Sequence, residues 1–79
     1  MDSDVALIFP LHVTKRMRRR HISESMIRAV LGDYDEMFER DDGRTEYWGV
    51  CEGRFIQVVL EGEREPYVVV TVIDQTRTS

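Results

Sequence analysis

Two different periods of apolar residues divide the chain, and the change between them falls at residue 33. Before that position, apolar residues recur at the three- and four-residue spacings that place them on one face of an α-helix. After it, apolar and polar residues alternate between turn residues, a pattern typical of β-strands with one covered face. The pattern therefore predicts an α+β fold, with helices in the N-terminal part and a sheet in the C-terminal part.

The first apolar run, VALIF at residues 5–9, predicts a short strand or an arm packed on the core. Pro10 follows it and suits the first turn of a helix, where its missing N–H would have no partner. We predict a first helix over residues 11–20. Val13 and Met17 lie four residues apart and mark its inner face.

A break over residues 21–23 separates this helix from a second one. Ser23 is a typical N-cap, and Gly32 is a typical residue just past a helix C-terminus. One apolar stripe lies between them, made of Met26, Ile27, Val30 and Leu31. Two short helices joined by a tight turn predict a helical hairpin over residues 11–32.

The C-terminal pattern predicts a four-stranded antiparallel meander over residues 33–74. Its strands are predicted at residues 35–40, 44–51, 54–61 and 67–74. Asp42-Gly43 is a hairpin turn sequence, because both residue types tolerate a positive φ, and Glu52-Gly53 is a second tight turn. With the helical hairpin packed on one face, the predicted order is ααββββ, followed by a polar tail at residues 75–79.

Length and composition limit this architecture to one small domain of residues 1–79, in which residues 1–10 form an N-terminal arm. A content of 42% hydrophobic and 33% charged residues is ordinary for a soluble globular domain and argues against disorder. The lone Cys51 excludes an intramolecular disulfide and favours a reducing, cytoplasmic location. No apolar run approaches the roughly 20 residues needed to cross a bilayer, so we expect no membrane association.

Charge is distributed unevenly along the chain. Residues 1–32 carry six basic and three acidic side chains, whereas residues 33–79 carry five basic and twelve acidic ones. The two parts therefore have formal charges of +3 and −7, which give the net charge of −4. Such a polarised layout permits an anion to bind at the basic end.

The basic end is concentrated in HVTKRMRRRHI, residues 12–22, which holds both histidines and five of the eleven basic residues. His12 and Arg16 lie one helical turn apart. An imidazole can act as an acid or base near neutral pH, and a guanidinium matches phosphate oxygens. These are the groups that RNA cleavage without a metal requires.

Further side chains would complete an RNA site if the sheet edge folds near the first helix. Arg44 and Arg54 begin two predicted strands, and Tyr47 is able to stack on a base. No phosphate-binding glycine loop, paired-cysteine metal site or serine elbow is present, so we predict neither a cofactor nor a metal. The alternatives are a solvated basic helix surface, a helix-start His12 bonded to backbone, and a Tyr47 half-buried in the sheet.

Several short motifs, taken in order, resemble a widespread prokaryotic family of unknown function. They are His12, Arg16-Met17, Arg20, Ile22-Ser23, VLG, DDGR, the strand-opening Arg54 and VVVTV. The family signature is His-x3-Arg-x3-Arg-Gly-Ile, and the resemblance spans residues 12 to about 73 of this chain. His21 stands where the signature has glycine, so we expect a strained helix end or a different turn.

Proteins of that family are similar in layout to BrnT- and RelE-like toxins, small ribonucleases encoded beside an antitoxin. The resemblance implies RNA binding or cleavage and an antitoxin-like protein partner. It places His12, Arg16 and Arg20 at signature positions, as candidate catalytic residues. Arg44, Arg54 and Tyr47 are added as candidate substrate contacts. The net charge of −4 weighs against catalysis, because a positive field recruits RNA.

Two hypotheses follow. The first is a toxin-like domain that binds or cleaves RNA through the His12 and Arg16 face. The second is a non-catalytic interaction module or degenerate toxin, which binds a protein or forms a homodimer through a strand edge. An open cleft joining His12 to two or more arginines would favour cleavage. A buried His12 bonded to backbone, away from Arg44 and Arg54, would favour the module.

Overall fold

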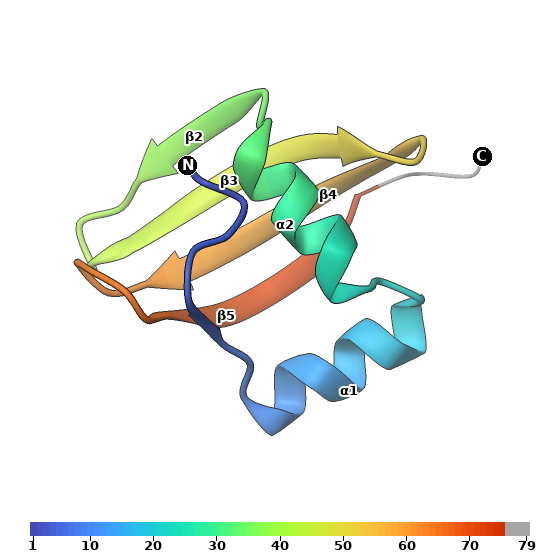
Figure 1. Cartoon of the computed structure of the whole chain (residues 1–79), viewed down its shortest axis with the longest axis horizontal. Helices are drawn as coiled ribbons and strands as arrows, with labels where there is room; N and C mark the ends of the chain where they lie inside the picture. Colours follow the sequence, from blue (N-terminus) through green and yellow to red (C-terminus); the bar gives the residue numbers. More distant parts are fainter. Residues whose placement is uncertain (76–79) are drawn as a thin grey trace.

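The computed structural model describes residues 1–75 of the chain, which form two helices and a five-stranded sheet (Figure 1). The elements are β1 (Leu7–Ile8), α1 (Leu11–Arg20), α2 (Glu24–Gly32), β2 (Glu36–Glu39), β3 (Arg44–Cys51), β4 (Arg54–Glu61) and β5 (Tyr67–Asp74). The strand order across the sheet is β1-β5-β4-β3-β2. The predicted α+β class is therefore confirmed. The predicted tail lies outside the described residues except for Gln75, whose N–H donates to the carbonyl of Phe55.

The sheet differs from the predicted meander by one strand. β2 to β5 pair antiparallel in chain order, as predicted, but β1 adds a parallel edge strand beside β5. Leu7 lies opposite Tyr67 in this pairing, and Ile8 lies opposite Val68. Only two residues of the N-terminal arm take part, and their partners are about sixty residues away. The apolar run at residues 5–9 predicted a short strand or arm, and a strand forms there, but its parallel pairing with β5 was not predicted.

The predicted helical hairpin is confirmed only in part. The two helices follow one another across a short turn, but they pack separately on the sheet (Figure 1). α1 packs against β5, whereas α2 packs against β3 and β4. Each helix has one narrow apolar face, and in both helices this face packs on the sheet. α1 consequently lies near the β5 edge and keeps most of its circumference in solvent.

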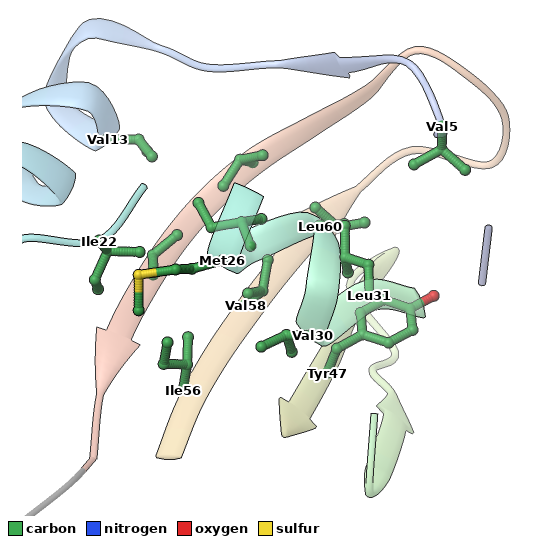
Figure 2. Close-up of a cluster of buried hydrophobic side chains, with 13 residues drawn as sticks. Val5, Val13, Ile22, Met26, Val30, Leu31, Tyr47, Ile56, Val58 and Leu60 are labelled. Carbon is green, nitrogen blue, oxygen red and sulfur yellow. The ribbon is translucent and has the colours of Figure 1, made fainter. Parts of the chain in front are cut away.

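The core lies between α2 and the inner face of the sheet (Figure 2). Ile27, Val30 and Leu31 of α2 are fully buried, together with Ile56 and Val58 of β4. Burial of one such side chain contributes about 1.5–3 kcal/mol. The apolar stripe predicted from the spacing in α2 is therefore the main contact of this helix with the sheet.

Gly49 allows α2 to lie close to β3. A β-carbon at this position would be 3.3 Å from the Cγ1 of Val30 and 3.4 Å from the Cα of Tyr34. The first distance is shorter than ordinary van der Waals contact, and the second is at its lower limit. The second neighbour is a backbone atom, which cannot move away as a side chain can. The helix and the strand approach each other so closely because this strand residue has no side chain.

The end of α1 shows how the helix terminates at His21. His21 adopts the left-handed conformation, with φ 57° and ψ 43°. Its N–H donates to the carbonyl of Arg18 over 3.4 Å, and the N–H of Ile22 donates to the carbonyl of Met17 over 2.8 Å. This is the Schellman pattern of helix termination, in which glycine is preferred. The turn is therefore retained, with a β-carbon in a conformation that disfavours one.

We expect His21→Gly to stabilise the protein relative to His21→Ala by about 1 kcal/mol, because glycine removes the β-carbon from a left-handed position. Chemical denaturation of both variants measures the difference. His21→Ala is the matched control, since both variants lose the imidazole and only one keeps the β-carbon. Equal free energies of unfolding would contradict the assigned strain.

Candidate functional site: the cationic surface of α1

α1 carries five basic side chains and no acidic one. We define its cationic surface as the exposed residues Lys15, Arg16, Arg18, Arg19 and Arg20. The last three occupy the final turn, where positive charge interacts favourably with the helix dipole. Only Val13 of this helix is fully buried, and it anchors the helix on the sheet side. Met17 is half-buried and packs against the same core, so the sequence pattern turns Val13 and Met17 inward, as predicted, and leaves the basic residues in solvent.

His12 lies at the start of α1 and contacts β5. Its Nε2 is 3.3 Å from the carbonyl oxygen of Val70, so Nε2 carries the proton in this hydrogen bond. The pairing of β4 with β5 shifts register after Val59, which lies opposite Thr71, while Leu60 lies opposite Val69. Val70 is the extra residue of this bulge and has no partner in β4, which leaves its carbonyl available to the imidazole.

Arg44 and Arg54 do not lie around His12. Arg54 begins β4, whereas Arg44 lies opposite Glu61 at the other end of that strand. β4 has eight residues, so its two ends lie about 23 Å apart in an extended chain. Arg44 also forms an ion pair with Glu61 over 3.6 Å. The pocket that both arginines were predicted to complete is therefore not formed by this arrangement.

Arg54 holds the end of α1 on the sheet. Its Nη1 donates to the carbonyl of His21 and its Nη2 to the carbonyl of Arg20, each over 2.7 Å. Its Nε donates to Oδ2 of Asp74 over 2.8 Å. The carbonyls at a helix C-terminus lack partners within the helix, so this guanidinium satisfies groups that would otherwise need water. Arg20 takes part through its backbone, and its side chain remains exposed.

Tyr47 belongs to the core. It is 6% exposed, and its ring meets that of Tyr34 edge-on, with centroids 5.1 Å apart and an interplanar angle of 68°. Burial raises the pKa of the Tyr47 hydroxyl above 10.0, and the neighbouring Tyr34, Tyr67 and Glu39 raise it further. A ring packed in this way does not offer a face to a base. The alternative assignment of Tyr47 to a covered sheet position fits the structure.

The opposite face of the sheet carries a polar network that the sequence analysis missed. The Glu46 carboxylate accepts from Trp48 Nε1 over 3.2 Å and from Gln57 Nε2 over 3.0 Å, and it pairs with Arg40 Nε over 2.6 Å. The rings of Trp48 and Phe55 lie 5.4 Å apart beside it. A glutamine inside the apolar run of β4 was the available signal, because a buried amide requires partners.

Neither condition set for His12 is met in full. The imidazole is exposed rather than buried, but it bonds to backbone and lies away from both Arg44 and Arg54. Residues 1–75 contain no detectable pocket and no group of three or more metal-ligating side chains. No helix in the same part of the chain is long and apolar enough to span a membrane. The arrangement offers an open, cationic surface for contact with an anion.

The fold and this surface define a small α+β domain with a cationic helix beside a five-stranded sheet. Residues 9–74 match the family described as a domain of unknown function, DUF4258, so the chain belongs to that family. Comparisons with curated proteins and with solved structures gave no match. Membership in a family of unknown function was predicted from the sequence. The similarity to BrnT- and RelE-like toxins, and the signature itself, remain hypotheses.

We expect Arg54→Ala to lower the free energy of unfolding by about 2–3 kcal/mol, because it leaves the carbonyls of α1 and the Asp74 carboxylate without this cation. Denaturant unfolding followed by circular dichroism measures the loss. Arg16→Ala is the matched control and should change stability by less than about 0.5 kcal/mol, since Arg16 is exposed. Similar losses in both variants would contradict the role of Arg54 in holding α1.

Burial of Tyr47 also predicts a pH dependence. Its folded-state pKa lies above the 10.0 of the free side chain, so its contribution to stability is complete below that pH and is lost as the pH rises through the folded-state pKa. We expect the wild type to lose more stability than Tyr47→Phe between about pH 9 and pH 11. Parallel denaturation curves at the two pH values provide the measurement, and identical losses would refute the prediction.

Proposed function

We propose that this domain binds RNA through the cationic surface of α1 and does not cleave it. The observation that carries the proposal is the separation of charge across the fold. The strand order puts α1 beside β5, whereas β2 lies at the opposite edge of the sheet. Six acidic residues lie within and next to β2, between residues 33 and 42. The tertiary structure thus keeps the basic helix apart from the largest group of acids.

The ion pairs of the fold support the same proposal. Residues 1–75 form four of them, with Arg28, Arg40, Arg44 and Arg54 as the cations. None uses a side chain of α1. Among residues 1–75, the acids of the sheet therefore form no ion pair with the basic side chains of this helix. Exposed guanidinium groups without acidic neighbours on their own helix are suited to phosphate oxygens.

Binding is favoured over cleavage because the groups needed for chemistry are dispersed. Cleavage requires an acid or base and cations that converge on one phosphate. Here the His12 imidazole donates to a strand carbonyl, while the Arg54 guanidinium closes a helix end. A row of cations along a helix needs no such convergence to contact successive phosphates. Of the two predicted activities, RNA binding and RNA cleavage, we therefore propose binding alone.

We expect the double variant Arg16→Gln/Arg19→Gln to bind a single-stranded RNA more weakly than the wild type. A single-stranded ligand gives a salt slope of about 0.7 per neutralised phosphate, so loss of two contacts lowers the slope by about 1.4. Fluorescence anisotropy with a labelled oligoribonucleotide, repeated at several salt concentrations, measures both quantities.

Arg44→Gln/Arg64→Gln is the matched control, because it removes the same charge from exposed or half-exposed positions outside α1. It should leave the salt slope unchanged. Equal weakening in both double variants would show a general charge effect and refute a site on α1. The same RNA is then run on a denaturing gel, with His12→Ala alongside. Cleavage that is lost in His12→Ala would overturn the non-catalytic part of the proposal.

A further inference from the structure

β2 is an exposed edge strand. It pairs with β3 on one side only, because it is the last strand in the sheet order. All four of its residues, EMFE at 36–39, are exposed. An edge strand presents backbone N–H and C=O groups that can pair with another chain. Neither proline nor glycine interrupts β2, so each of its residues keeps a backbone N–H and an ordinary strand conformation.

The backbone groups that face outward follow from the pairing with β3. The N–H of Arg40 donates to the carbonyl of Arg44 over 2.8 Å, which directs the backbone groups of Arg40 toward the sheet. Inward and outward groups alternate along an antiparallel strand. Phe38 and Glu36 therefore also bond inward, and Met37 and Glu39 direct their N–H and C=O groups away from the sheet. A partner strand has to pair with these two residues.

The side chains of the same edge divide between the two faces. Phe38 lies opposite Glu46 on the face away from the helices, where Arg40 also contacts Glu46. Glu36, two residues before Phe38, lies on this face as well. The phenyl ring is 51% exposed. The outer face of the edge thus has the order acid, aromatic ring, base, from Glu36 through Phe38 to Arg40.

We propose that a second copy of this chain pairs antiparallel with β2, in a register centred on Phe38. This register places Met37 opposite Glu39 of the second copy. The outward N–H and C=O groups of the two residues then bond to each other. The two Phe38 rings then face each other across the two-fold axis. Glu36 of each copy faces Arg40 of the other. The acid–aromatic–base order is therefore complementary to itself when the strand is reversed.

Charge distinguishes this register from its neighbours. Hydrogen bonding allows only those registers in which a residue with outward backbone groups lies opposite another such residue. A register centred on Met37 would place Glu36 opposite Phe38 and leave Arg40 without a facing acid, and one centred on Glu39 would place that carboxylate opposite its own copy. The Phe38 register places no like charges opposite each other within residues 36–40. The N–H of Asp35 donates inward to the carbonyl of Trp48 over 2.8 Å, so the alternation ends there and the pairing is limited to the length of β2.

Arg40 is able to serve both copies. It contacts its own Glu46 through Nε, and the two Nη groups of a guanidinium carry further donors for Glu36 of the second copy. The contact is short, because β2 has four residues. Standard stable interfaces bury about 1,600 Å² in total, more than an edge of this length supplies. We therefore expect a dimer that forms with increasing concentration rather than an obligate one.

The test uses a mixture of two charge variants. In Glu36→Arg, two arginines face each other in the dimer, and in Arg40→Glu two glutamates do so. Each variant alone should dimerise at least about tenfold more weakly than the wild type, because like charges directly opposite one another destabilise paired strands. An equimolar mixture should recover dimer, since both facing pairs are then of opposite charge. Sedimentation velocity over a range of concentrations measures the dissociation constants.

Two further variants compare the edge with the rest of the outer face. Phe38→Ser should weaken dimerisation, whereas Val50→Ser should not, because Val50 is 58% exposed on β3 outside the pairing with β2. Circular dichroism confirms that each variant is folded. A wild type that stays monomeric up to millimolar concentration overturns the proposal, as does a mixture that recovers no dimer. No RNA is present, so the outcome is independent of the function proposed above.

Discussion

The guanidinium of Arg54 connects the parts of this domain that matter most for its surface. From the first position of β4 it reaches the last carbonyls of α1 and the carboxylate of Asp74 at the end of β5. α1 otherwise has one fully buried side chain, so this cation and the packing of Val13 determine where the helix lies. A residue predicted to contact substrate thus positions the helix that presents the cationic surface.

The strand order turns a charge difference along the chain into a charge difference in space. In the sequence, only residues 21–32 separate the basic helix from the acids around β2. The order β1-β5-β4-β3-β2 puts them at opposite edges of the sheet. A domain with a net charge of −4 consequently presents one strongly basic helix. Net charge alone does not describe this surface, because local fields at a surface depend on where the charges lie.

The sequence predicted what depends on local spacing. The limits of α1, β3, β4 and β5 follow from apolar periodicity and turn residues, and Ser23 caps α2 as expected by accepting from the N–H of Met26. Features with distant partners were not predictable in this way. The parallel pairing of β1 is one, and the bulge that frees the Val70 carbonyl for His12 is another. Both depend on how segments far apart in the chain are aligned.

The candidate site shows the same division. Composition and helical spacing alone determined that α1 is basic on its exposed side, because every residue involved lies within three turns of one helix. Only the tertiary structure decided what the other candidates do. Arg54 reaches carbonyls more than thirty residues away, Tyr47 lies beneath α2, and Arg44 begins β3 opposite the far end of β4. A strand residue has no preferred partner until its sheet and helices are assembled, so its chemistry cannot be assigned from spacing.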